Sequence, residues 1–377
     1  MKTFNLEGPT WAFFTPEQMF GEEAKLRAAH KHYINADLYM LTKMNKVFFD
    51  TKKTRVTRDG SLSMVLHVGN QEKKEFDKIK LKFPLIISTY TIPSVKETFS
   101  SMKECFATLL YRQYVPRSDR KKTVVKIAKG LHRRGILTDK ALFKVLMLVY
   151  STEIKFEHKT PYEVSVYDPI IECTTDNEKA KLARQKNPRR YELNDANWDL
   201  EKKKEVNFDE LPGFNETYNA TFMVDQVVNL LDVDVGGQEV IYIGKTEQDD
   251  FNRLSAHNKL NKLNALHLRD EYKSNVVHLL GFKHYETIGF SNRNSNIKNS
   301  DAISTAEACL INYFKPRDNT HYVDDSGADG WKHRKVLKKK KYTNIKVLLD
   351  IDGQYTKFYT KHLGHQGKNS HDFEFRI

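Results

Sequence analysis

Hydrophobic and polar positions divide the chain into two regions that predict folded structure, separated by a polar segment. The first region contains stretches with the spacing of a helix and stretches that alternate as a strand does. Thr15-Pro16-Glu17 is typical of a helix N-terminus, and Asp59-Gly60 between two alternating runs is a strong hairpin signal. The elements expected are a helix over Thr15–Lys46, strands over Lys53–Thr57, Ser63–Val68 and Leu81–Thr91, and a helix over Val95–Tyr114.

Ser118–Tyr150 predicts two short helices. Val124, Ile127 and Leu131 share one helical face, Gly135 is placed to end the first helix, and Thr138 to cap the second. Lysine and arginine side chains crowd the first helix. Two interpretations stay open: a helix-turn-helix that reads DNA, and a plain helical scaffold, which is the favoured one because any antiparallel helix pair gives this pattern.

The amino-acid composition changes after Cys173. Residues 173–214 are highly charged and poor in aliphatic side chains, as in a linker or extended arm. Apolar content returns at Thr221–Val235. Near the C-terminus, a basic stretch precedes two alternating runs joined by Asp352-Gly353, which predicts a hairpin of Ile345–Ile351 with Gln354–Thr360.

Composition narrows the classes of function. The chain of 377 residues carries 62 Lys and Arg against 49 Asp and Glu, a net charge of +13. An excess of this size favours a polyanionic partner, and nucleic acid is the commonest soluble one. No apolar run approaches the roughly 18 residues that span a bilayer. The three cysteines suggest neither a disulfide framework nor a zinc site, so a cytoplasmic location is expected.

The segment VIYIGKT and the residues after it carry candidate chemistry. Val240–Ile243 predicts a buried strand that breaks at Gly244, with Lys245 just beyond. A helix is expected to follow, with Arg253 and His257 four residues apart and therefore on one face. This arrangement would present Tyr242, Arg253 and His257 to one cleft.

A second segment, Ser304–Asn319, predicts a helix with a carboxylate on its apolar face. Glu307 shares that face with Leu310, Ile311 and Phe314. A capping box formed with Ser304 is one explanation of the spacing. The alternative is that Glu307 is a ligand for a hard metal ion.

Taken together, Tyr242-Ile243-Gly244, Arg253-x-x-x-His257 and Glu307 followed by Asn319 resemble the GIY-YIG nuclease family, over about residues 215–319. The resemblance implies a small antiparallel three-stranded sheet flanked by helices. It also implies hydrolysis of phosphodiesters with one divalent metal, Mg²⁺ or Mn²⁺, held by Glu307. Tyr242 would help to deprotonate water, Arg253 would steady charge on the phosphate, and Gly244 and Asn319 would have structural roles.

One feature departs from the family pattern. The first strand should carry a tyrosine about ten residues before Tyr242, where this sequence has none. Phe222 could occupy that position, with Tyr218 as the nearest replacement phenol. The general base is therefore left open among Tyr242, Tyr218 and His257, in that order.

The fold expected is α+β, with a GIY-YIG-like domain over residues 215–320, a mixed α/β domain over 1–172, a linker over 173–214 and a basic hairpin extension over 321–377. The function expected is a metal-dependent endonuclease on double-stranded DNA, first in restriction or phage defence, then in homing or repair. A non-catalytic nucleic-acid-binding module is the rival hypothesis. No membrane contact is expected, and a protein partner or second copy is left open. Four lysines are candidates for phosphate contact: Lys338, Lys339, Lys340 and Lys341.

Overall fold

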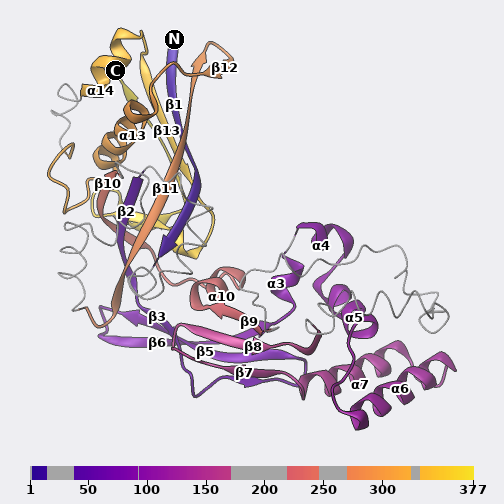
Figure 1. Cartoon of the computed structure of the whole chain (residues 1–377). Coiled ribbons are helices and arrows are strands. Elements are labelled where there is room, and N and C mark those ends of the chain that lie inside the picture. The colour runs from indigo at the N-terminus through magenta and orange to yellow at the C-terminus, as the bar shows by residue number, and fades with distance from the viewer. Residues whose placement is uncertain (1, 15–37, 92, 171–218, 246–269, 324–331) are drawn as a thin grey trace. The chain divides into compact units, whose positions relative to one another are not determined.

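The structure is a computed structural model that describes residues 2–14, 38–91, 93–170, 219–245, 270–323 and 332–377. The chain divides into two compact units whose segments alternate along the sequence (Figure 1). The first unit consists of Met1–Lys46, Val68–Asp77 and Asp232–Ile377, and the second of Val47–His67 and Lys78–Leu231. Residues from both ends of the chain therefore build one unit, and the second unit is inserted within it.

A nine-stranded mixed sheet forms the first unit. Its order is β15-β14-β10-β2-β11-β1-β13-β16, with β12 paired to β11. Pairs β1/β13 and β10/β14 are parallel, and the other pairs are antiparallel. The strands are β1 (Lys2–Phe14), β2 (Leu38–Asn45), β10 (Gln238–Lys245), β11 (Lys273–Ile288), β12 (Ser291–Asn294), β13 (Asn344–Asp350), β14 (Phe358–Thr360), β15 (Gly364–Lys368) and β16 (Ser370–Arg376).

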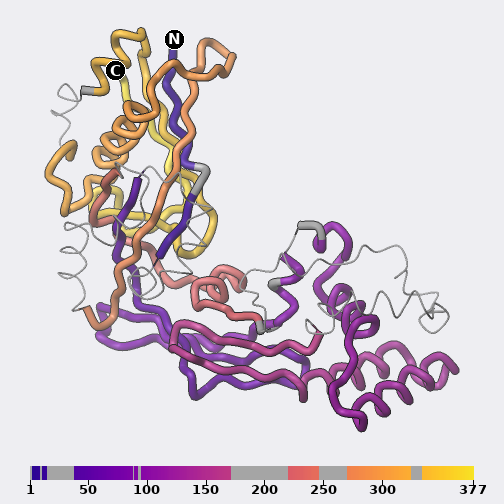
Figure 2. The backbone as a smooth tube through the Cα atoms, viewed as in Figure 1, coloured from indigo at the N-terminus to yellow at the C-terminus, as the bar shows by residue number. Residues whose placement is uncertain are grey.

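β15 and β16 are the two edge strands of this sheet, and only Asn369 lies between them in the sequence. The two edges are therefore close together, and the sheet nearly closes on itself. The Asn369 amide donates hydrogen bonds to the carbonyls of Ile351 and Gly353 and to the Thr356 hydroxyl. Figure 2 shows the first strand of the chain, in indigo, running beside the orange and yellow strands of its C-terminal half.

Helix α13 (Asn299–Phe314) supplies much of the hydrophobic core of the first unit, and α14 (Lys332–Lys339) follows it. Alternate strand residues such as Leu38 and Met40 point to one face, as the two-residue period of a strand requires. They are fully buried in the same core as Leu310 and Phe314 of α13. Burial of this continuous apolar surface is the main force that holds helix and sheet together.

A buried polar network lies elsewhere in the first unit. The Trp11 indole donates to His278 Nδ1 at 3.0 Å, which leaves the proton of the neutral ring on Nε2, facing Gln238 Oε1 at 2.8 Å. The Thr42 hydroxyl also donates to Gln238 Oε1. Burial lowers the pKa of His278 to about 3, so this ring is neutral at physiological pH.

The second unit contains two smaller sheets and a group of helices. One sheet has the order β3-β5-β4, with β6 paired to β5, and the other has the order β7-β8-β9. The elements are β3 (Val47–Phe49), β4 (Arg55–Val56), β5 (Ser61–Asn70), β6 (Glu75–Pro84), α3 (Ile87–Tyr90), α4 (Pro93–Thr98), α5 (Met102–Arg112), α6 (Asp119–Arg133), α7 (Asp139–Ser151), β7 (Lys155–Glu157), β8 (Glu163–Tyr167), β9 (Asn219–Met223) and α10 (Val224–Leu230).

Several sequence predictions are confirmed. The chain is a mixed α/β protein. β4 and β5 pair antiparallel across Asp59-Gly60, where Gly60 adopts a φ of 73°. Helices α6 and α7 form the expected pair, with Gly135 at a φ of 72° between them and the Thr138 hydroxyl accepting from the Ala141 amide. In the part of the chain that is described, no helix has the length and apolarity needed to cross a bilayer.

Three predictions are wrong. Leu38–Asn45, expected to end a long helix, is strand β2, because pairing with β10 and β11 overrides its local helical pattern. The strand expected over Leu81–Thr91 ends at Pro84 and gives way to α3. The C-terminal hairpin does not form: β13 pairs with β1 and β16, whereas β14 pairs with β10 and β15. The linker at 173–214 lies outside the described residues.

Candidate functional site

Strands β2 and β10 place two tyrosines side by side. In their antiparallel register Tyr39 lies opposite Gly244, and Leu41 lies opposite Tyr242. Directly opposed residues of an antiparallel pair share a face of the sheet. The rings of Tyr39 and Tyr242 accordingly have centroids 5.8 Å apart, and both side chains are buried.

A β-bulge sets the direction of Tyr242. Val240 pairs with Thr42, yet Tyr242 pairs with the next residue, Leu41, so Ile241 is an extra residue in β10. Without it, strict alternation would put Tyr242 on the face of Val240, which belongs to the hydrophobic core. The bulge thus turns the phenol of Tyr242 towards Tyr39.

Gly244 is required by the close approach of Tyr39. A Cβ atom at position 244 would lie 2.6 Å from the Tyr39 hydroxyl oxygen and 2.7 Å from Cζ of the same ring. The expected break of the strand at this glycine is wrong, because β10 continues to Lys245. The glycine makes room for a buried ring and does not form a turn.

Glu307 lies in the interior of helix α13. The helix begins at Asn299, so Ser304 is a buried residue of its second turn and not its N-cap. The capping-box explanation of Glu307 is therefore wrong. Glu307 is half-buried, whereas its neighbours Ala306 and Ala308 are fully buried.

Electrostatics connects the carboxylate with the tyrosine pair. Burial is the main cause that raises the pKa of Tyr39 far above the usual value for a phenol. The charge of Tyr242, a hydrogen bond to it and the charge of Glu307 each raise the pKa further. Tyr39, Tyr242 and Glu307 therefore interact, and we call them the tyrosine–glutamate cluster. Its phenol at position 39 stays protonated near neutral pH.

Asn319 closes the free edge of β10 beside this cluster. Its amide accepts from the Ile243 N–H at 2.9 Å and donates to the Ile243 carbonyl at 2.8 Å, as a neighbouring strand would. The Asp318 N–H adds a bond to the Ile241 carbonyl. On the side of α13, Lys245 Nζ lies 3.5 Å from the Ser304 hydroxyl. These contacts hold the backbone of Ile241 and Ile243, the residues on either side of Tyr242.

Three predicted site residues, Tyr218, Arg253 and His257, lie outside the described residues. Phe222 is described, and it does not take the place of a site tyrosine. It lies on β9, which pairs with β8 in a separate sheet, and its ring packs 4.9 Å from that of Phe83.

Tyr39 is the site residue that the sequence interpretation missed. The strand paired with β10 precedes most of the second unit in the sequence, so it is far from the residues just before Tyr242. A signal was present in Leu38-Tyr39-Met40-Leu41, a short apolar run with a central tyrosine that resembles Val240–Ile243 in composition.

The cluster offers one carboxylate that could serve as a ligand of a metal ion. Within the described ranges, no three His, Cys, Asp or Glu side chains gather into a metal-binding group. Glu307 is the carboxylate of the tyrosine–glutamate cluster. Mg²⁺ is often bound through one or two carboxylates while it retains several water ligands.

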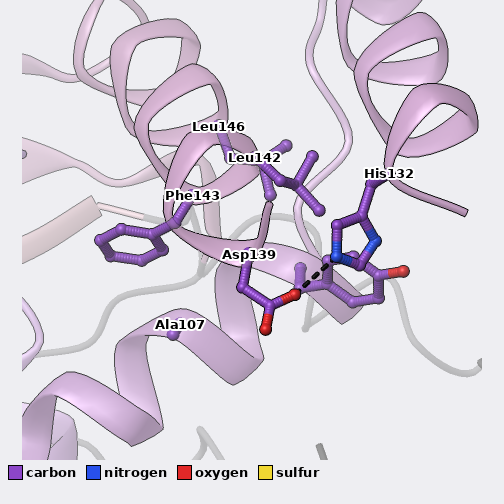
Figure 3. Close-up of a pocket in the computed structure, with 7 residues that line it drawn as sticks. Ala107, His132, Asp139, Leu142, Phe143 and Leu146 are labelled. Atoms are coloured by element: carbon purple, nitrogen blue, oxygen red, sulfur yellow. Dashed lines mark hydrogen bonds and ion pairs between the residues drawn. The ribbon is translucent and has the colours of Figure 1, made fainter. Parts of the chain in front are cut away.

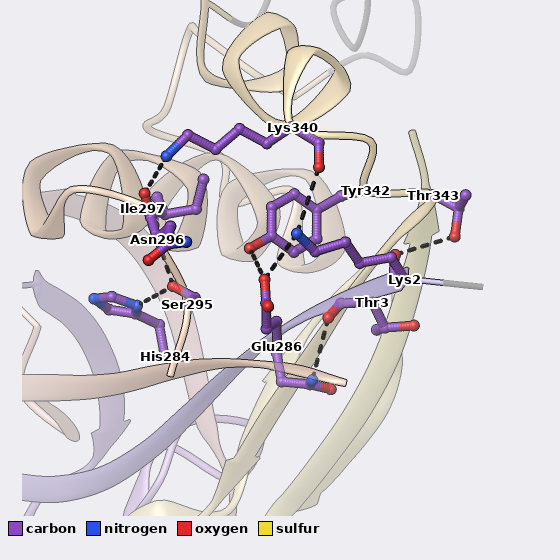
Figure 4. Close-up of polar contacts among 11 residues, drawn as sticks. Lys2, Thr3, His284, Glu286, Ser295, Asn296, Ile297, Lys340, Tyr342 and Thr343 are labelled. Carbon is purple, nitrogen blue, oxygen red and sulfur yellow. Dashed lines mark hydrogen bonds and ion pairs between the residues drawn. The ribbon is translucent and has the colours of Figure 1, made fainter. Parts of the chain in front are cut away.

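The four lysines at the end of α14 are exposed. Lys338 and Lys339 occupy its last turn, where positive charge stabilises the helix terminus, and Lys341 follows in a left-handed conformation. Figure 4 shows Lys340 reaching the Asn296 carbonyl beside the ion pair of Lys2 with Glu286. The exposed lysines could contact phosphate. Their position at the end of α14 is also a sufficient structural reason for the lysine run.

Comparison with protein-family models, with curated proteins and with solved structures finds no match for this chain.

Proposed function

We propose that this chain is a metal-dependent endonuclease of the GIY-YIG type that hydrolyses phosphodiester bonds in double-stranded DNA. The observation that carries the proposal is the tyrosine–glutamate cluster. Two phenols from strands distant in sequence and one carboxylate from α13 interact electrostatically. Gly244 leaves room for one phenol, and Asn319 clamps the strand that bears the other.

The arrangement of strands adds support. β10, β2 and β11 are neighbours and antiparallel, and α13 packs against β10. These three antiparallel strands and their flanking helix have the arrangement that the sequence resemblance implies. Further strands extend the sheet. In it, Tyr39 would supply the first tyrosine, and the second unit would be an insertion between the two tyrosine-bearing strands.

The two phenols suit different tasks. Tyr39 keeps its proton and, through its hydrogen bond with Tyr242, can hold the second phenol in place. Tyr242 is then the first candidate for the base that accepts the proton of that water, ahead of Tyr218 and His257. Lys245 and Arg253 are cations that could meet the charge that builds on the phosphate in the transition state.

Glu307 would hold the Mg²⁺ or Mn²⁺ ion through its carboxylate. A divalent ion bound there would offset phosphate charge and make water or a nearby phenol easier to ionise. The charge of Glu307 contributes to the raised pKa of Tyr39, so the carboxylate and the protonated phenol belong to one electrostatic unit.

Restriction or phage defence in the cytoplasm is the setting that we propose, followed by homing and repair. The inserted second unit is large enough to select a target or bind a partner, as defence nucleases require. The rival function is a non-catalytic nucleic-acid-binding module, which the missing first tyrosine would favour. Tyr39 beside Tyr242 could supply that tyrosine, so this reason for the rival function is weakened.

Single-turnover cleavage of plasmid DNA by the full chain, with Mg²⁺ or Mn²⁺ and with chelator, tests the proposal. Glu307→Gln should abolish cleavage while DNA binding in chelator persists, because the amide keeps the size and removes the charge. Tyr39→Phe and Tyr242→Phe should each slow cleavage by about 10²–10⁴, the usual contribution of acid–base catalysis. Tyr313→Phe is the matched control. It removes a phenol from the same helix as Glu307, one that contacts His371, and should cleave normally.

Two results would contradict the proposal. One is cleavage by Glu307→Gln at the parental rate, and the other is metal-independent cleavage by the parent protein. Sequencing the ends of the plasmid fragments then separates the settings. A single repeated junction indicates a specific restriction or homing enzyme, and random junctions indicate a nonspecific defence effector.

A further inference from the structure

Helix α6 of the second unit carries two β-branched aliphatic side chains on its solvent-exposed side. Val124 and Ile127, which share one helical face, are 42% and 56% exposed. The buried side of the helix consists instead of Val125, Ala128 and His132. The outward face therefore displays apolar groups that the fold of this unit does not use.

The same outward face is strongly basic. Arg120 shares one exposed flank of the helix with Val124 and Ile127, whereas Lys122, Lys126 and Arg133 line the other exposed flank, and the exposed Arg134 follows the last helical residue. The one acidic residue of the helix, Asp119, pairs with Lys122. No carboxylate among the described residues forms an ion pair with the other four cations. Their charges are thus available to a ligand.

Two further lysines on α6 make contacts inside the second unit. They are therefore distinct from the exposed cations. Lys121 pairs with the buried Glu153 at 3.3 Å. Lys129 donates to the Tyr111 carbonyl at 2.7 Å and lies over the Tyr111 ring. Burial, together with the charge of Arg133, lowers the pKa of Lys129 to about 8.

Small residues occupy the centre of the outward face. Thr123 and Gly130 are seven residues apart, two helical turns, so both lie on one line along the helix. A Cβ atom at Gly130 would meet nothing within 4 Å. A glycine at an open, mid-helix position weakens the helix and brings no packing benefit inside the unit. It does allow a large ligand to approach the helix backbone between the basic side chains.

The helix is held firmly enough to act as a preformed surface. The Ser118 hydroxyl caps its N-terminus by accepting from the Lys121 N–H. At the other end, His132 Nε2 lies 2.6 Å from Asp139 Oδ1 at the start of α7, beside a small cavity lined by Leu142, Phe143 and Leu146 (Figure 3).

We propose that the outward face of α6 docks onto duplex nucleic acid, with double-stranded DNA as its partner. Arg120 and Arg134 are about 21 Å apart along the helix axis at 1.5 Å per residue. That length exceeds the roughly 12 Å width of the DNA major groove, so the two arginines can reach phosphates on opposite sides of it. The exposed Val124 and Ile127 can contact thymine methyl groups or sugar carbons there.

The test is equilibrium binding of the full chain to a DNA duplex in chelator over a series of salt concentrations. Chelator removes any dependence on cleavage, so this inference and the proposed nuclease function can fail separately. One variant replaces three outward cations: Arg120→Gln, Lys126→Gln and Arg134→Gln. The matched control removes the same charge from exposed lysines elsewhere in the second unit: Lys78→Gln, Lys80→Gln and Lys103→Gln.

We expect the α6 variant to bind at least tenfold more weakly, with a log–log salt slope reduced by about 0.9 for each lost phosphate contact. The control should change affinity less than threefold. Gly130→Glu should also weaken binding at least tenfold by placing a carboxylate at the centre of the face.

The inference is overturned if both triple variants bind alike, or if Gly130→Glu binds normally. Vesicles of phosphatidylserine provide the remaining comparison. Loss of vesicle binding with unchanged DNA binding in the α6 variant would assign the face to an anionic membrane surface and would also reject a DNA partner.

Discussion

Replacing Gly244 by alanine is the sharpest test of the site geometry. The new Cβ would meet the Tyr39 ring at three atoms, 2.6 Å from the hydroxyl oxygen, 2.7 Å from Cζ and 2.9 Å from Cε1. Tyr39 is only 1% exposed, so the ring has no free space into which it can move. Such overpacking costs about 1–3 kcal/mol. Because alanine suits a strand better than glycine by about 0.5–1 kcal/mol, the net destabilisation should lie between about 0 and 2.5 kcal/mol, with a central value of about 1 kcal/mol.

Urea unfolding of the full chain measures this free energy, with the transitions of the two units fitted separately. Tyr39→Leu should relieve the clash, so Gly244→Ala should cost nothing or stabilise slightly in that background. The coupling energy of this double-mutant cycle should exceed about 1 kcal/mol. Tyr39→Phe should not relieve the clash, because Cζ and Cε1 remain in place.

Gly130→Ala is the matched control in the same chain. Open space surrounds that position on α6, so the substitution should stabilise the second unit by about 0.5–1 kcal/mol. A stabilising effect of Gly244→Ala, or an equal cost with leucine at position 39, would refute the close approach of Tyr39. Cleavage should fall with Gly244→Ala.

Three further outcomes are expected. Arg253→Ala should slow single-turnover cleavage by about 10²–10³ with little change in DNA affinity, since transition-state charge exceeds ground-state charge; normal cleavage would remove Arg253 from the site. Replacing Lys338, Lys339, Lys340 and Lys341 by alanine should weaken DNA binding and lower the salt slope by about 0.9 for each phosphate contact, and an unchanged slope would make this run a solvated helix end. Burial lowers the pKa of His278 to about 3 and that of His371 to about 4, so the unfolded chain binds more protons between pH 6.5 and 4 and stability is lost as the pH falls through this range. His278→Gln should reduce the pH slope of the unfolding free energy by up to about 1.4 kcal/mol per pH unit, measured by urea unfolding at pH 7, 6 and 5, and an identical slope would contradict the neutral buried ring.

Local chemistry in the sequence was enough to predict features that depend on a few neighbouring residues. Asp59-Gly60 gives a hairpin because glycine tolerates the positive φ that the turn needs. Thr138 caps α7 because its hydroxyl satisfies a free N–H of the first turn. The same reasoning failed at Asp352-Gly353, where the flanking strands find better partners elsewhere in the sheet.

The sequence alone determined the mixed α/β class, the hairpin and helix pair of the second unit, and Tyr242, Gly244, Glu307 and Asn319 as a candidate set. Only the tertiary structure decided that Tyr39 faces Tyr242, because the two strands become neighbours across an insertion that no local pattern reports. It also decided why Gly244 is a glycine, since the ring that excludes a Cβ comes from the other strand. Pairing between distant strands is set by burial and hydrogen bonding across the whole sheet, and these depend on residues far apart in the chain.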